Sequence, residues 1–351
     1  MPYAQPTSPL PHGSGRHGHA NQHGEKSARW SNTPRGKAVV CPRTPPLRPW
    51  RLLPVFNADV LLEKAPPRRR ALQEVAFVFL AVFAPSVVGG LGRWAVVAVG
   101  VALLGAGLFL LRPRKEDWAA ILALIVALVG ACAGVWELAG AEKPEGLSLS
   151  MTPLSIRALG MCLLVAVLLW RDGQGPAQVG VVREGWPREL LVSLAVIAGT
   201  YVVHIGVAVP LGLLAMALKL TGAELMARKD VAKALLETNL SVPAFAAIML
   251  VVTGFEEFVF RAFLVPRLRV VLGRWVPAVL AGGVLFAVGH FYEGVIAVFQ
   301  TFALGVWFGF VLLYRGRLLP LIIAHATFNT VSYALMLLLA RSGFLDKLPT
   351  P

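Results

Sequence analysis

The stretch AFAAIMLVVTGFEEFVFRAFLVP, residues 244–266, decides the fold class. It is long and apolar enough to cross a bilayer as a helix, which takes ~20 residues. Its interior nevertheless holds Glu256, Glu257 and Arg261. An ionisable side chain at mid-bilayer costs at least ~2.5–3.5 kcal/mol, so such residues mark candidate functional sites.

The rest of the chain has the same apolar character. Of the 351 residues, 56% are hydrophobic and only 15% are charged, whereas soluble domains carry about 25% charged residues. Apolar runs of spanning length or close to it recur along the chain. They cover about 72–91, 94–111, 118–139, 153–170, 190–217, 243–265, 276–292, 295–314 and 318–340. We therefore predict an all-α polytopic membrane protein with about eight or nine transmembrane helices and its active site inside the helical bundle.

Basic charge is concentrated near the N-terminus. Residues 1–70 hold 12 Lys and Arg against 3 Asp and Glu, which is +9 of the total net charge of +14. Residues 1–50 are rich in Pro, Gly, Ser, His and Arg, and we expect them to be disordered because they cannot bury a core. In a membrane protein this charge indicates a cytoplasmic tail beside anionic lipid and does not indicate nucleic-acid binding.

The loops between the apolar runs support this orientation. Basic residues recur after alternate runs, at Arg112, Arg114, Lys115, Arg171, Arg183, Arg188, Arg267, Arg269, Arg274, Arg315 and Arg317. The positive-inside rule then predicts a multi-pass protein with a cytoplasmic N-terminus and an external C-terminus. Residues 219–240 mix charges with apolar residues at helical spacing and fit either an interfacial amphipathic helix or a solvated helical connector.

The charges in the sixth run divide by helical geometry. Glu256 and Glu257 are neighbours and point about 100° apart, so only one is expected to face a given site. Glu257 and Arg261 are four residues apart and are expected to pair on one face. That pairing leaves Glu256 free to face a cavity. The alternative is that all three residues form a lock between helices.

Histidines occur in three other runs. His290 follows Phe286 by one helical turn, and His325 precedes Asn329 by one turn, so each pair is expected to share a face. His204 has no polar neighbour at helical spacing and is interpreted as a packing residue.

These groups suit hydrolysis of a carbonyl compound. A carboxylate and a histidine around one water form a general base, and a second histidine with an amide can stabilise an oxyanion. A zinc ion held by Glu256, His290 and His325 stays open as an alternative to a site without a cofactor. We expect a cavity in the middle of the membrane, reached from the cytoplasmic side.

Three segments resemble the motifs of a known family. EEFVFR (256–261), FAVGH (286–290) and HATFN (325–329) resemble the EExxxR, FxxxH and HxxxN motifs of the CPBP family, the CAAX protease and bacteriocin-processing family, also called Abi or Rce1-like. The resemblance covers about residues 180–340.

The resemblance implies an intramembrane glutamic endopeptidase. Glu256 and His290 would activate water, and His325 and Asn329 would hold the oxyanion. Glu257, Arg261 and Phe286 would support them. Substrates would be membrane-associated or lipidated CAAX-like proteins or peptide precursors.

The same reasoning gives three parts of the chain. Residues 1–70 form a basic tail, 71–179 form N-terminal transmembrane helices, and 180–342 form the protease domain. Two other functions stay open: a catalytically silent immunity or scaffold protein, and a proton-coupled transporter. The expected partners are the lipid bilayer and a membrane-associated substrate, without nucleic acid.

Overall fold

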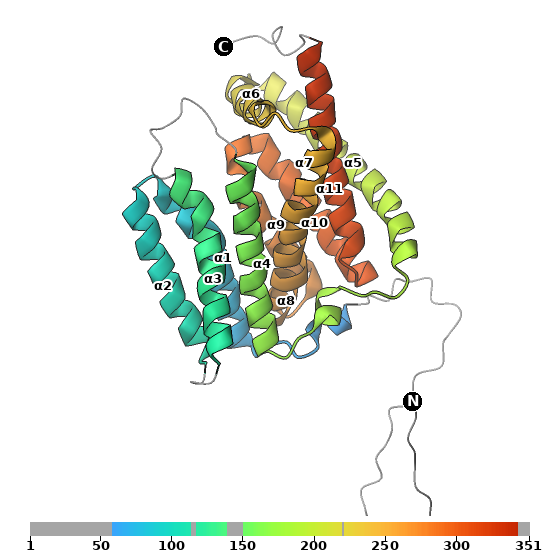
Figure 1. The fold of residues 1–351 in the computed structure, drawn as a ribbon. Helices are drawn as coiled ribbons and strands as arrows, with labels where there is room; N and C mark the ends of the chain where they lie inside the picture. The colour runs from blue at the N-terminus through green and yellow to red at the C-terminus, as the bar shows by residue number, and fades with distance from the viewer. Residues whose placement is uncertain (1–57, 114–116, 139–149, 220, 343–351) are drawn as a thin grey trace, which may run out of the picture. The chain divides into compact units, whose positions relative to one another are not determined.

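The computed structural model describes residues 58–113, 117–138, 150–219 and 221–342. These residues are helical almost throughout (Figure 1). The α-helices are α1 (Arg68–Gly89), α2 (Arg93–Leu111), α3 (Trp118–Leu138), α4 (Met151–Arg171), α5 (Trp186–Ala217), α6 (Thr221–Glu237), α7 (Val242–Glu256), α8 (Val265–Leu272), α9 (Trp275–Val288), α10 (Val295–Arg315) and α11 (Leu319–Arg341). Short 3₁₀ turns occur at η1 (Asp59–Leu62), η2 (Pro176–Val179) and η4 (Phe291–Glu293), and a π-helix, η3, covers Glu257–Leu264.

Each apolar run of the sequence overlaps at least one helix of this all-α protein. By length and composition, six helices within the described part of the chain are able to cross a membrane, or up to seven if α6 and the helix that follows it form one broken span. This number is lower than the expected eight or nine. Residues 118–133 of α3 and the whole of α9 are apolar but shorter; the 14 residues of α9 reach only ~21 Å, against a hydrocarbon core of ~30 Å.

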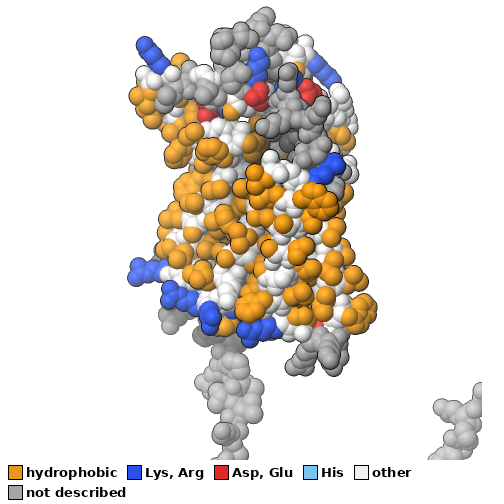
Figure 2. All heavy atoms as spheres, turned by 90° about the vertical axis from the view of Figure 1, so that its left-hand side faces the viewer, with side chains coloured by type: hydrophobic (Ala, Val, Ile, Leu, Met, Phe, Trp, Pro, Cys, Tyr) orange, Lys and Arg blue, Asp and Glu red, His pale blue; other side chains and the backbone are white. Residues whose placement is uncertain are grey.

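The outer surface of the described bundle carries the pattern of a membrane protein. Figure 2 shows a broad band of apolar side chains, with Lys and Arg side chains below it and others above it. Large side chains such as Val87, Leu191 and Val202 are more than two-thirds exposed, as expected for residues that face lipid. The protein is therefore an integral, multi-pass membrane protein.

The expected N-terminal tail lies outside the described residues up to position 57. Residues 58–70, grouped with the tail in the sequence analysis, include η1, whose Leu61 is buried against the helical core.

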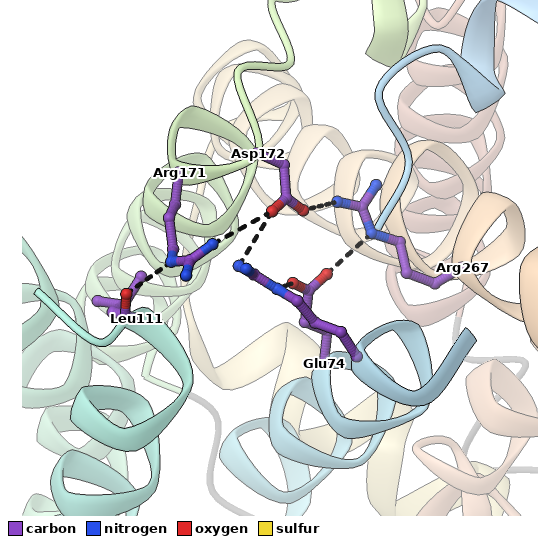
Figure 3. A network of polar contacts seen from close by, with 6 residues as sticks. Glu74, Leu111, Arg171, Asp172 and Arg267 are labelled. Carbon is purple, nitrogen blue, oxygen red and sulfur yellow. Dashed lines mark hydrogen bonds and ion pairs between the residues drawn. The ribbon is translucent and has the colours of Figure 1, made fainter. Parts of the chain in front are cut away.

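An ionic network joins the N-terminal helices to α8 (Figure 3). Glu74 of α1 pairs with Arg70 at 2.8 Å and with Arg267 at 3.1 Å, and Asp172, just after α4, pairs with the same two arginines at 3.0 and 3.1 Å. Burial raises the pKa of the Asp172 carboxyl, and both arginines oppose that rise. The network ties the segment 71–179 to the segment that carries the site.

Small residues allow α3 and α4 to pack closely. A Cβ added at Gly160 would lie 2.8 Å from the backbone oxygen of Ala127 and the backbone nitrogen of Ala131. Close approach through small residues is a common way for membrane helices to associate.

The segment 219–240 contains α6, the helix that its spacing predicted. It meets α7 at an angle of 114°, and Figure 1 places it at the end of the bundle away from α8. Its Arg228 donates a hydrogen bond to Gln300 of α10 at 2.8 Å. At Arg228, α6 therefore contacts α10.

Candidate active site

The two carboxylates lie where the helix changes its hydrogen-bonding pattern. α7 ends at Glu256, and the π-helix η3 begins at Glu257. A π-helix forms i→i+5 hydrogen bonds and is frequently found at functional sites. Because its turn is wider, successive side chains point in directions that differ from those in a regular α-helix.

The imidazole of His325, in α11, lies between the two carboxylates. Its Nδ1 is 2.9 Å from Oε1 of Glu257, and its Nε2 is 3.6 Å from Oε2 of Glu256. The first distance is that of a hydrogen bond, and the second is longer than one. The two carboxylates approach different nitrogens of one ring, but only Glu256 lines the cavity, as the pairing of Glu257 with Arg261 predicted.

The predicted pair of Glu257 and Arg261 is confirmed. Nη1 of Arg261 lies 3.1 Å from Oε1 of Glu257, and both side chains are buried. The guanidinium Cζ is 3.8 Å from the centroid of the Phe286 ring and 5.6 Å from that of Phe308. Such cation–π contacts stabilise a charge that water cannot reach. Gly305 of α10 lies next to this guanidinium, since a Cβ there would be 3.4 Å from Nη2 of Arg261.

His290 lies in a turn and not within a helix. α9 ends at Val288, so the apolar run 276–292 is not one continuous helix. The predicted proximity to Phe286 is confirmed, with ring centroids 4.7 Å apart. Nδ1 of His290 is 3.1 Å from the backbone oxygen of Phe286. A carbonyl oxygen only accepts, so Nδ1 is the donor and a neutral ring keeps Nε2 as an acceptor.

Side chains of Glu256, His290, His325 and Asn329 line one cavity of about 380 Å³. They come from α7, the α9–η4 turn and α11. Among the described residues, neither Glu256 and His290 nor His325 and Asn329 share a hydrogen bond or an ion pair. The amide of Asn329 makes only a long contact of 3.9 Å to the sulfur of Met249, which leaves its donors available to a ligand.

The cavity extends toward α6. Beyond the four polar residues it is lined by Met151 at the start of α4, Leu235 of α6 and Met336 near the end of α11. Figure 1 places α6 at the end of the bundle opposite α8, which carries Arg267. The cavity thus extends toward the end of the bundle that carries α6 and away from Arg267.

The carboxylate and histidine groups do not fit a metal centre. Within the described ranges, no group of three or more His, Cys, Asp or Glu side chains is arranged to hold a metal ion. Glu256, His290 and His325 line one cavity but do not make up such a group. We therefore assign no step to a metal.

Sequence reasoning missed several polar residues of the cavity. His204, interpreted as a packing residue, lines it, and its Nδ1 is buried without a hydrogen-bond partner among the described residues. Gln300, Thr301 and Tyr292 also line the cavity. Their positions depend on how α5, η4 and α10 pack against one another, and residue spacing within one helix does not predict that packing.

Comparison with known proteins identifies a family for part of the chain. Residues 238–331 match the family model for the Rce1-like type II CAAX prenyl endopeptidases. The matched segment contains all seven residues singled out by the three motifs. No curated protein and no solved structure matches the chain. Residues 238–331 of this membrane protein therefore form a domain of the Rce1-like, or CPBP, family, which implies an intramembrane protease.

Proposed function

We propose that the protein is an intramembrane endopeptidase that hydrolyses a peptide bond in membrane-associated substrates. The observation that carries the proposal is the placement of Glu256 beside His325 in a cavity between membrane helices. Ionisable groups among apolar membrane helices are costly, and such residues are therefore candidates for a functional site.

In the proposed mechanism Glu256 acts as the general base. It removes a proton from a water molecule that also donates a hydrogen bond to Nε2 of His290, and the oxygen attacks the carbonyl carbon of the scissile bond. The protonated Glu256 then delivers that proton to the leaving amine as the carbon–nitrogen bond breaks. No covalent intermediate with the protein is required.

His325 and Asn329 are proposed to stabilise the oxyanion. An imidazolium at His325 donates through Nδ1 to Glu257 and offers its Nε2–H to the developing negative charge. The amide of Asn329, whose contact within the described residues is the long one to Met249, offers a second donor. Arg261 and Phe286 hold Glu257 in place and thereby fix the orientation of the His325 ring.

The substrates we propose are CAAX-like lipidated proteins or peptide precursors. The cavity walls combine the polar cluster with apolar side chains such as Leu154, Phe245 and Met249, a surface that suits a peptide segment already held at the membrane.

The proposal is tested with the full chain purified into lipid nanodiscs and a panel of prenylated and unmodified peptides. Glu256→Gln and His290→Ala should each lower the cleavage rate by about 10²-fold or more. The control is Glu237→Gln, which changes a carboxylate on α6 that is 60% exposed and should leave the rate unchanged. Full cleavage by Glu256→Gln would contradict the proposed role of Glu256 as the base. Absence of cleavage by the unchanged protein would instead favour the silent scaffold protein.

A further inference from the structure

The turn that carries His290 is weakly packed. η4 (Phe291–Glu293) joins α9 to α10, and none of its three side chains is buried. The backbone nitrogen of Glu293 donates to the backbone oxygen of His290 at 3.0 Å, and that of Gly294 donates to the oxygen of Phe291 at 3.3 Å. Because the side chains of the turn contribute little packing, the position of His290 depends on the helix end that borders the turn on each side.

On one side the turn is held by α9. The backbone nitrogen of His290 donates to the oxygen of Ala287 at 3.0 Å. A Cβ added at Gly289 would lie 3.1 Å from the ring of Phe83 in α1, so the chain runs close to that ring just before His290. This side is therefore fixed by the last turn of α9 and its contact with α1.

On the other side, α10 begins without a capping side chain of its own. The first N–H groups of a helix have no partner within the helix. The side chain at the N-cap position normally accepts a hydrogen bond from the second or third helical residue. In α10 that position is occupied by Gly294, which has no side chain to do so.

Glu224 of α6 supplies the missing acceptor. Its Oε2 accepts from the backbone nitrogen of Ile296, the second residue of α10, at 3.2 Å. A negative charge is favoured at a helix N-terminus by the helix dipole. The other oxygen, Oε1, lies 3.3 Å from Nε of Arg228, which donates to Gln300 of α10 at 2.8 Å. The first two turns of α10 are thus bound to α6.

Gly294 is required for the close approach of Glu224. Its φ is 102°, a conformation that side chains disfavour, and an added Cβ would lie 2.7 Å from Oε2 of Glu224. The carboxylate therefore lies directly against the junction of η4 and α10, where it is only 11% exposed.

We propose that Glu224 is a positioning residue for His290: it caps α10 from outside the helix, fixes the η4 turn, and so places the imidazole that holds the attacking water. The proposal rests on the proposed function and deepens it with a residue outside the segment that matches the family model. Val231 and Leu235 of α6 also line the cavity. The site is therefore competent only while α6 is docked on α10.

The first test does not depend on turnover. Hydrogen exchange of the backbone amides of residues 291–298 is measured on the full chain in lipid nanodiscs. Glu224→Leu removes the acceptor of the Ile296 N–H and should speed exchange in this segment about fivefold, as expected for a lost cap. Glu224→Gln keeps an oxygen that can accept and should give a smaller increase. The matched control is Glu237→Gln, also on α6 and 60% exposed, which should leave exchange unchanged. Unchanged exchange in Glu224→Leu overturns the proposal.

Cleavage kinetics then show whether the cap acts through His290. Glu224→Leu should lower kcat about tenfold with little change in KM, because a displaced His290 impairs the reaction more than substrate binding. In the His290→Ala protein, the same substitution should cause no further loss of the residual single-turnover rate. A residue that only stabilises the fold would lower both rates alike, so an equal fall in the two backgrounds contradicts the positioning role.

The two measurements separate this proposal from the proposed function. A protein that cleaves no peptide would refute the proposed function, while hydrogen exchange would still decide whether Glu224 holds the turn. Cleavage with an unchanged kcat in Glu224→Leu would leave the proposed function in place and refute the role of Glu224. Should Glu224→Leu fail to fold, Glu224→Gln takes its place in both measurements, with smaller changes expected in the same directions.

Discussion

Nδ1 of His325 lies 2.9 Å from Oε1 of Glu257, and the same oxygen lies 3.1 Å from Nη1 of Arg261. Glu257 thus holds a histidine and an arginine at once, whereas Glu256 only approaches the far side of the same ring at 3.6 Å. Two neighbouring carboxylates consequently have different environments, and their replacement should have different effects.

Glu257→Gln should lower both stability and activity. The change removes the anion from the buried guanidinium of Arg261, and breaking such a pair costs about 3–5 kcal/mol. Glu256 is 17% exposed, and its closest ion pair within the described residues is the long contact of 3.6 Å to His325, so Glu256→Gln should abolish cleavage with little change in Tm. Thermal unfolding and peptide cleavage measured on both variants check this split. A larger loss of Tm in Glu256→Gln would contradict it.

Arg267→Met should destabilise the protein strongly because it leaves Glu74 and Asp172 without one of their cations. Loss of one partner of a buried ion pair costs about 3–5 kcal/mol. The double variant with Glu74→Gln should recover part of that loss, since fewer buried charges then lack a partner. The exposed Arg274→Met is the control and should leave Tm nearly unchanged. Equal effects of the two arginine variants would show that the network contributes little.

Gly160→Ala should separate α3 from α4 and lower the free energy of unfolding by about 1–3 kcal/mol, the usual cost of overpacking. The new Cβ would meet backbone atoms, which cannot rotate away. Gly105→Ala in α2 meets nothing within 4 Å and serves as the control. Chemical denaturation measures both, and an unaffected Gly160→Ala would mean that the helices are not in close contact.

Metal chelators should leave cleavage intact. Glu256, His290 and His325 do not form a three-donor group within the described residues, and the proposed mechanism takes its proton transfers from side chains alone. The measurement is peptide cleavage after incubation with EDTA or 1,10-phenanthroline, followed by addition of Zn²⁺. Activity that disappears and then returns with zinc would reinstate the metal alternative.

The sequence predicted the class of the fold and part of the site. Long apolar runs specify membrane helices because a segment in lipid must satisfy its own backbone hydrogen bonds, and a helix does so within the segment. The pair of Glu257 and Arg261 was predictable because both residues belong to one helix, where spacing sets direction. The three motifs are also local patterns, and they indicated the family whose model matches residues 238–331.

The break of α9 before His290 and the 114° bend between α6 and α7 were not predicted. Both depend on which helices pack against these segments, and the hydropathy of a segment does not predict that.

The sequence by itself thus determined that charged residues lie in membrane helices and which of them share a face. Only the tertiary structure decided that His325 stands between both carboxylates and that Arg228 turns the amide of Gln300. Contacts between residues 68 and 72 positions apart depend on how whole helices pack. The packing of two helices depends on the side chains over the whole contact surface of both, so a short sequence pattern does not predict it.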